Sequence, residues 1–236
     1  MKSLNEDLKT GQFKQIYLLY GEEAYLKKLY KNRFVKAMVP EGDTMNYRYF
    51  EGKNTNPKEI IDLAETLPFF AERRLIVLEN TGFLKNATPE LAEYLKNMPE
   101  TTYMIFVESE LDKRGKLYKV IKEKGHIVEL KRQDEKTLMR WAAGILAREG
   151  RKITTRDMEL FLTKTGTDMG NIRMELEKLI CYTMGREVIT KEDVEAVGTV
   201  HVTNRIFEMV TAIVAGNTRK AMDLYEDLLT LKEPPM

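Results

Sequence analysis

Short apolar runs alternate with helix-like patterns through roughly the first 130 residues, and this alternation constrains the fold more than any other feature of the sequence. Residues 15–20 (QIYLLY) end at Gly21 and have the length and apolar content of a strand buried on both faces. The other strand candidates are residues 47–50, 74–79, 103–107 and 126–130, and helical patterns cover 22–39, a segment opening at Asn56-Pro57, 88–98 and 113–124. Strands separated by helices predict an α/β fold with a mostly parallel, doubly covered sheet.

After residue 133 the strand-like runs stop and helical patterns follow one another. They cover residues 134–148, 154–165 and 168–184, a short helix opening at Thr190, and then 204–215 and 218–231. We therefore predict an α/β domain over residues 1–134, a small all-α domain over 135–203, and a third domain starting at 204–236. The last two helices have apolar faces without partners, so we expect this third, helical domain to be incomplete.

Composition excludes several classes of function. Lys and Arg (38) nearly balance Asp and Glu (37), and a net charge of +1 argues against coating nucleic acid or an anionic membrane through bulk charge. Cys181 has no cysteine partner, and His126 and His201 lie too far apart in sequence for the usual metal-ligand spacings. With neither a signal sequence nor an apolar stretch of membrane-spanning length, the expected setting is the cytoplasm, without membrane contact.

The turn after the first strand candidate is where an α/β protein would bind a phosphate. Here it reads Gly21, Glu22, Glu23, without the second glycine and the Lys-Ser or Lys-Thr pair that a P-loop requires. The two glutamates place negative charge where a helix N-terminus would otherwise attract an anion. We interpret the turn as a degenerate phosphate loop and expect no nucleotide, no metal and no other cofactor.

The remaining candidates for catalysis are few. Glu79 is the last residue of the strand candidate 74–79 and is interpreted as a solvated strand end, and Glu108 and Glu110 as loop residues. Cys181 and Trp141 fall in apolar-rich helical patterns, which favours the core over a nucleophile or a binding residue. We predict no catalytic residue.

Basic residues crowd the segment 113–124, where Lys113, Arg114 and Lys116 are candidates for DNA contact. Around a helix these charges spread over a wide polar arc, as on a solvated face, whereas a phosphate-tracking patch should cluster. A solvated face is the favoured interpretation.

The segment Leu67, Pro68, Phe69, Phe70 ends one helix and precedes a central strand, so it should lie in a loop at one edge of the sheet. From these residues alone, the phenylalanines are expected to plug the end of the core. The alternative is a protruding aromatic wedge that enters a hydrophobic pocket of a partner.

Several blocks of the sequence resemble the delta subunit of the bacterial replicative clamp loader, a component of DNA polymerase III. They are residues 16–26 (IYLLYGEEAYL), 65–75 (ETLPFFAERRL), 111–119 (LDKRGKLYK) and 171–179 (NIRMELEKL), with Ile206-Phe207 and Ala221-Met222-Asp223-Leu224 in the tail. Together they cover nearly the whole chain in order.

The resemblance implies an AAA+-like domain, a helical lid and the first helices of a collar domain truncated in this chain. It implies an accessory subunit without an active site of its own, which binds the ring-shaped sliding clamp and favours its opening for loading on primed DNA. The holoenzyme that it joins is a DNA-directed DNA polymerase, a nucleotidyltransferase. Expected partners are the clamp (beta subunit), the gamma/tau and delta prime subunits through the collar, and primed DNA. The clamp-binding wedge of the family matches Leu67, Pro68, Phe69 and Phe70, which reverses the interpretation that these rings plug the core.

Two other functions stay open on the sequence. A nucleotide-binding AAA+ ATPase would show a nucleotide-induced rise in melting temperature, and the turn at Gly21 argues against it. A nucleic-acid-binding α/β module using residues 113–124 would bind DNA with a steep salt dependence, and the near-zero net charge argues against that.

Overall fold

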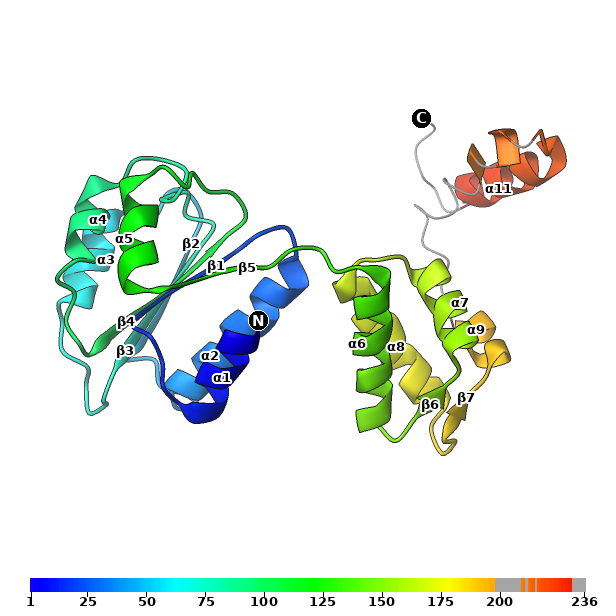
Figure 1. Ribbon diagram of the computed structural model, residues 1–236, viewed down its shortest axis with the longest axis horizontal. Coiled ribbons are helices and arrows are strands. Elements are labelled where there is room, and N and C mark those ends of the chain that lie inside the picture. Colours follow the sequence, from blue (N-terminus) through cyan, green and yellow to red (C-terminus); the bar gives the residue numbers. More distant parts are fainter. Residues whose placement is uncertain (198–208, 211, 215, 231–236) are drawn as a thin grey trace. The chain divides into compact units, whose positions relative to one another are not determined.

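A computed structural model describes residues 1–197, 209–210, 212–214 and 216–230 (Figure 1). The chain divides into two compact units, residues 1–132 and 133–236, which we describe separately. The predicted domain limits, 1–134, 135–203 and 204–236, stay predictions, and the second boundary falls outside the described residues.

The first unit is built on a five-stranded sheet in the order β2-β3-β4-β1-β5, in which every neighbouring pair is parallel. The strands are β1 (Ile16–Tyr20), β2 (Tyr47–Glu51), β3 (Arg74–Glu79), β4 (Thr102–Glu108) and β5 (His126–Glu129). The register pairs Leu18 with Phe106 on one side of β1 and with Ile127 on the other. The predicted α/β fold with a parallel sheet is confirmed.

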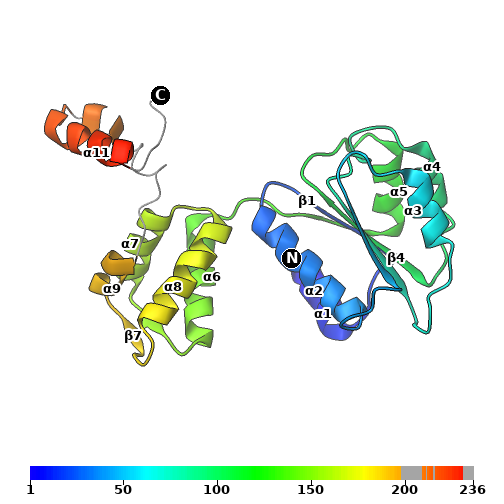
Figure 2. The same ribbon diagram turned by 180° about the vertical axis from the view of Figure 1, so that it is seen from behind.

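Helices cover both faces of this sheet (Figures 1 and 2). On one face lie α1 (Lys2–Thr10) and α2 (Ala24–Met38), and on the other α3 (Pro57–Ala64), α4 (Pro89–Tyr94) and α5 (Lys116–Lys124). The Asn56 side chain accepts a hydrogen bond from the Lys58 amide at 3.0 Å, and Pro57 occupies the first turn of α3. This is the N-terminal signal that the sequence carries.

The core follows from this layering. Every residue of β1 is buried, and its side chains alternate between the two faces. Leu18 joins the cluster formed with α3, α4 and α5, whereas Tyr17 packs on Phe34 of α2 with ring centroids 4.5 Å apart. Each such side chain contributes about 1.5–3 kcal/mol by leaving water. A strand covered on both sides therefore reads as a continuous apolar run.

Helix α1 is not predicted by the sequence analysis. Its single buried residue is Leu4, too little for a recognisable apolar stripe, although Gly11 ends it in the left-handed conformation that helix C-termini favour. Polar contacts hold it to the sheet instead. The Tyr17 hydroxyl donates to Asp7 Oδ2 at 2.8 Å, and His126 Nδ1 lies 3.3 Å from the same oxygen. Burial raises the pKa of Tyr17, which favours this donor role.

The second unit contains α6 (Glu135–Arg148), α7 (Thr155–Thr165), α8 (Met169–Tyr182), α9 (Lys191–Val197) and α11 (Thr218–Thr230). A short parallel pair, β6 (Lys152–Ile153) and β7 (Val188–Ile189), joins α6–α7 to α8–α9 and has no counterpart in the predicted all-helical pattern. Two residues are too few to produce a periodic signal. Most of the predicted helix 204–215 lies outside the described residues.

Two side chains of this unit differ from expectation. Cys181 is exposed, because it lies two residues, about 200° of helical turn, beyond the buried Leu179 on α8. Trp141 is half-buried, beside the fully buried Ala142. No helix in the described ranges is long and apolar enough to cross a membrane.

Candidate functional site

The turn at Gly21 lies at the edge of the sheet where the strands end. Its φ of +123° is one that glycine adopts most readily, and a Cβ there would fall 2.5 Å from the Leu130 carbonyl oxygen. The Glu23 amide donates to that same oxygen at 3.0 Å. The glycine thus serves a close approach between two segments of main chain. The buried Glu23 carboxylate then accepts from the Tyr25 amide at 3.2 Å and caps α2.

One turn into α2, Lys27 lies buried beside the ends of the strands. Its Nζ donates to the Glu108 carbonyl oxygen at 3.3 Å and to Ser109 Oγ at 2.9 Å. The Glu108 carboxylate, 3 % exposed, accepts from the amide and hydroxyl of Thr81 at 3.1 and 2.9 Å. Burial lowers the pKa of Lys27 and raises that of Glu108. These charged groups find their partners within the protein.

Glu79 is not the solvated strand end that the sequence indicates. Its Oε2 forms an ion pair with Lys31 Nζ from α2 and accepts a hydrogen bond from the Tyr49 hydroxyl at 2.7 Å. Lys31 also lies 4.9 Å from the centroid of the Tyr49 ring. The sequence did carry a signal for this contact. Lys31 follows Lys27 by four residues, and this (i, i+4) spacing places both ammonium groups over the same end of the sheet. Glu22, by contrast, stays exposed, 3.7 Å from Arg132.

The candidates for DNA contact lie at the start of α5. The helix begins at Lys116, not at residue 113 as predicted, because Lys113 and Arg114 belong to the turn that precedes it. Arg114 binds the carboxylate of Asp112 at 3.0 Å, and Lys113 Nζ lies 4.0 Å from Glu129 Oε1. All three basic side chains are exposed, and DNA contact by them stays a prediction.

Residues 65–73, which we name the diphenylalanine loop, lie at the opposite edge, where the strands begin. The loop follows α3 and leads into β3. The exposed fractions are 77 % for Leu67, 56 % for Phe69 and 96 % for Phe70, whereas Pro68 is half-buried. The two rings contact edge-to-face, with centroids 4.6 Å apart. The phenylalanines therefore do not plug the end of the core.

Two buried polar side chains hold this loop, and sequence reasoning missed both. Asn46 Oδ1 accepts from the Phe69 amide at 2.6 Å, and Asn46 Nδ2 donates to the Phe69 carbonyl oxygen at 2.9 Å. Arg74 donates to the carbonyl oxygens of Thr66 and Leu67 at 3.2 and 2.9 Å. The signals available were an arginine opening an otherwise apolar strand and the turn-forming pair Asp43 and Asn46.

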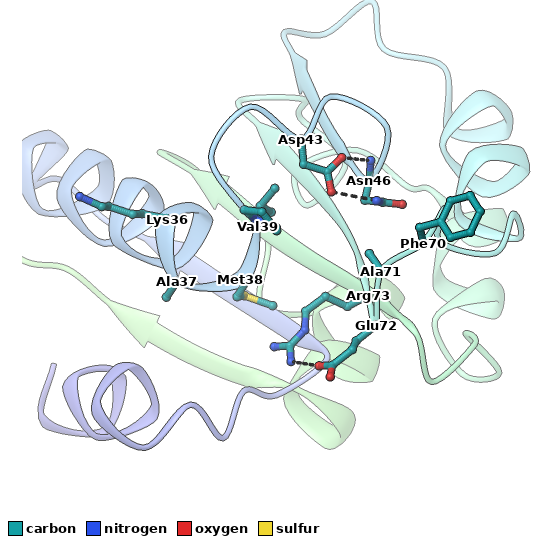
Figure 3. Close-up of a pocket in the computed structure, with 11 residues that line it drawn as sticks. Lys36, Ala37, Met38, Val39, Asp43, Asn46, Phe70, Ala71, Glu72 and Arg73 are labelled. Atoms are coloured by element: carbon teal, nitrogen blue, oxygen red, sulfur yellow. Dashed lines mark hydrogen bonds and ion pairs between the residues drawn. The ribbon is translucent and has the colours of Figure 1, made fainter.

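A cavity of about 400 Å³ lies beside the loop, between it and the end of α2 (Figure 3). Apolar atoms of Met38, Val39 and Pro40 line it together with Phe70 and the charged pair Glu72–Arg73, which is separated by 3.2 Å. In Figure 3 the Phe70 ring points away from Met38 and Arg73. The loop thus presents its aromatic rings outward.

Comparison with known proteins gives one consistent family. Residues 17–131 match the family described as DNA polymerase III, delta subunit, and residues 203–236 match the DNA polymerase III delta subunit, C-terminal domain. The chain is 28 % identical over 243 aligned residues to DNA polymerase III subunit delta of Bacillus subtilis, covering 98 % of this chain and 70 % of that protein. The probable delta subunit of Aquifex aeolicus is 23 % identical, with 94 % of this chain and 66 % of that protein covered.

Solved structures agree with this assignment. The DNA clamp loader delta protein of Bacillus subtilis superposes with a TM-score of 0.73 and 26 % identity, covering 99 % of this chain and 73 % of that one. The RuvB Holliday junction branch migration motor of Thermotoga maritima, 13 % identical, has a TM-score of 0.51 over 83 % of this chain and 65 % of its own; this likeness shows the AAA+-like fold alone. The chain belongs to the family of DNA polymerase III delta subunits, the delta subunits of the bacterial clamp loader.

Proposed function

We propose that this chain binds the sliding clamp through the diphenylalanine loop and favours the opened ring, without hydrolysing a nucleotide itself. The observation that carries the proposal is the exposure of Phe69 and Phe70, at 56 % and 96 %, on a loop held by hydrogen bonds from buried side chains. Water-exposed aromatic pairs of this kind are what a hydrophobic pocket on a partner recognises.

The energetics of the pair suit a dominant contact. Transfer of one phenylalanine from water to an apolar pocket contributes about 1.5–3 kcal/mol, so the pair supplies about 3–6 kcal/mol. Ring opening then needs no bond-making by this chain. A ligand that binds the open ring more tightly than the closed ring shifts the clamp's own equilibrium by that difference in affinity.

The opposite edge of the sheet supports a role without nucleotide chemistry. At Gly21 the loop has one glycine, and Glu23 caps the helix that would face a phosphate. Lys27, the lysine nearest this turn among the buried residues, is engaged by Glu108 and Ser109. In the proposed function the other loader subunits, gamma/tau and delta prime, bind through the C-terminal collar, and the assembled loader places the clamp on primed DNA.

The decisive experiment measures binding of this chain to the sliding clamp of its own organism, comparing wild type with Phe69→Ala/Phe70→Ala. We expect a loss of at least about 100-fold, equivalent to ~2.7 kcal/mol. A matched control is Tyr182→Ala/Met184→Ala, which removes two side chains of similar exposure, 56 % and 77 %, from the second unit.

Ring opening is measured separately, by release of the clamp from nicked circular DNA in the presence of this chain. Wild type and the control double variant should release the clamp at equal rates, and the phenylalanine variant should not release it. Absence of wild-type binding, or equal binding by both double variants, would refute the proposed function.

A further inference from the structure

At the diphenylalanine loop an apolar side chain is exposed and polar side chains are buried, the reverse of the usual placement. Phe70 is 96 % exposed, whereas the two polar residues that flank the loop in space, Asn46 and Arg74, are 3 % and 6 % exposed. Buried polar groups are kept where they have hydrogen-bond partners, and here the partners are main-chain atoms of the loop itself. These buried side chains therefore hold the main chain of the loop in its conformation.

Asn46 holds the main chain of Phe69 from both sides. Its side-chain oxygen accepts from the Phe69 amide at 2.6 Å and its side-chain nitrogen donates to the Phe69 carbonyl oxygen at 2.9 Å. The same nitrogen donates to Asp43 Oδ2 at 2.8 Å, which fixes the orientation of the amide group (Figure 3). Asn46 thus pairs with Phe69 as a neighbouring strand would pair with it.

Arg74 ties the first half of the loop to the same turn. Its guanidinium donates to the Thr66 and Leu67 carbonyl oxygens and, at 3.1 Å, to the Met45 carbonyl oxygen. The planar fork of the guanidinium fixes the relative positions of these acceptors better than a flexible ammonium would. Both halves of the loop are therefore joined to residues 43–46.

Phe70 itself has a φ of +49°, a left-handed conformation that is unfavourable for a bulky side chain. Strain of this kind persists where the surrounding structure imposes it. With Phe69 fixed by Asn46 on one side and β3 opening at Arg74 on the other, the left-handed residue turns the Phe70 ring into solvent.

We infer that Asn46 and Arg74 are positioning residues, which hold the diphenylalanine loop in its clamp-binding shape before the clamp is met. The inference rests on the proposed function and deepens it. The loop loses its conformational entropy during folding, so that less conformational entropy is lost when it binds the clamp. Neither residue needs to touch the clamp. Affinity then depends on hydrogen bonds made inside the free subunit.

The first test is a double-mutant cycle on clamp affinity. Asn46→Ala should weaken binding by about 10-fold in the wild-type background and have no further effect once Phe69 and Phe70 are alanine. The matched control is Thr81→Val, which removes a buried hydrogen bond, 2.9 Å to Glu108 Oε1, from the same unit at the opposite edge of the sheet. It should lose comparable stability and leave clamp affinity unchanged.

The second test needs no clamp. Amide hydrogen exchange on the free chain should show a protected Phe69 amide in wild type and in Thr81→Val, and faster exchange, by about 10-fold or more, in Asn46→Ala. If Asn46→Ala does not fold, Asp43→Ala removes the orienting carboxylate from a partly exposed position and should give a smaller change in the same direction.

The outcomes separate the two claims. Clamp binding that is lost in Phe69→Ala/Phe70→Ala but unchanged in folded Asn46→Ala would overturn the inference and leave the proposed function standing. An exposed, fast-exchanging Phe69 amide in wild type would also overturn the inference. A wild-type chain that does not bind the clamp would overturn both.

Discussion

At the edge of the sheet where the strands end, charged side chains are buried and paired; at the edge where the strands begin, two phenylalanines are exposed. Parallel sheets usually bind their ligands at the first of these edges, where loops and helix N-termini supply donors. Here the buried side chains of Glu23, Lys27 and Glu108 form hydrogen bonds with main-chain and hydroxyl groups of the protein. At the opposite edge Phe69 and Phe70 are exposed, and there we propose the contact with the clamp.

The comparison shows two edges of one AAA+-like sheet with opposite surfaces, one of buried charged groups and one of exposed aromatic rings. A nucleotide site needs unsatisfied donors facing a cavity, whereas at this turn the Glu23 amide donates to the Leu130 carbonyl oxygen. A protein-binding site gains from apolar surface held in one shape, and Asn46 and Arg74 make hydrogen bonds to the main chain of the exposed loop. Four measurements would break or sharpen this contrast.

The largest expected effect compares two phenylalanines of the same unit. Phe34→Ala removes a fully buried ring that packs on Tyr17 and should lower the free energy of unfolding by about 3–5 kcal/mol. Phe70→Ala removes a ring that is 96 % exposed and should change it by less than about 0.5 kcal/mol. Urea denaturation of both variants measures this, and a strongly destabilised Phe70→Ala would mean that the ring belongs to the core.

The next effect concerns the turn at Gly21. Gly21→Ala places a Cβ 2.5 Å from the Leu130 carbonyl oxygen, at a φ of +123°, and should cost about 3 kcal/mol of unfolding free energy. Gly42→Ala is the matched control, since its φ is +83° and no atom lies within 4 Å, and about 1 kcal/mol is expected there. Equal losses would show that the close approach to Leu130 is unimportant.

A smaller effect is a change in pH dependence at Glu108. Burial raises the folded-state pKa of this carboxyl above its ordinary 4.5, so the native state binds more protons than the unfolded state in the interval above 4.5. Its contribution to stability is therefore present below pH 4.5 and is lost as the pH rises through the folded pKa. Glu108→Gln keeps an acceptor for Thr81, should match wild type at pH 4.5 to within about 1 kcal/mol, and should lack this decline.

The control for that experiment is Glu110→Gln, an exposed carboxyl whose pKa the Lys85 contact lowers. Its removal should not reduce the decline above pH 4.5. Denaturation curves between pH 4.5 and 8 measure the difference between the variants, and parallel curves for wild type and Glu108→Gln would contradict the assigned burial effect.

The last comparison concerns nucleotide binding, for which we expect no change in melting temperature. A nucleotide at 100 times its dissociation constant would stabilise the chain by about 2.7 kcal/mol, which thermal denaturation detects readily. We expect no rise in Tm with millimolar ATP or ADP and Mg²⁺, because the Gly21 turn lacks a phosphate cradle. A dose-dependent rise would restore the ATPase hypothesis and remove the contrast between the two edges.

Much of this architecture was predictable from local patterns. The strands read as apolar runs because both faces of the sheet are covered, and Asn56-Pro57 marks a helix start by the side-chain cap and fixed φ that a first turn needs. Helix α1 and the short β6–β7 pair were missed, since one buried leucine and two-residue strands produce no periodicity. The absence of a P-loop motif at Gly21 is readable from the sequence, because the motif depends on residue types at adjacent positions; that the turn binds no nucleotide stays a prediction.

The sequence by itself determined the alternation of strands and helices, the lack of a phosphate cradle at Gly21 and the presence of adjacent phenylalanines in a loop. Only the tertiary structure decided which way those rings face. Asn46 and Phe69 are 23 residues apart, and their hydrogen bonds form because β2 and β3 lie side by side. Glu79 likewise pairs with Lys31 from a distant helix. Contacts between segments far apart in the chain leave no periodic trace in either segment, so exposure at this loop had to be read from the fold.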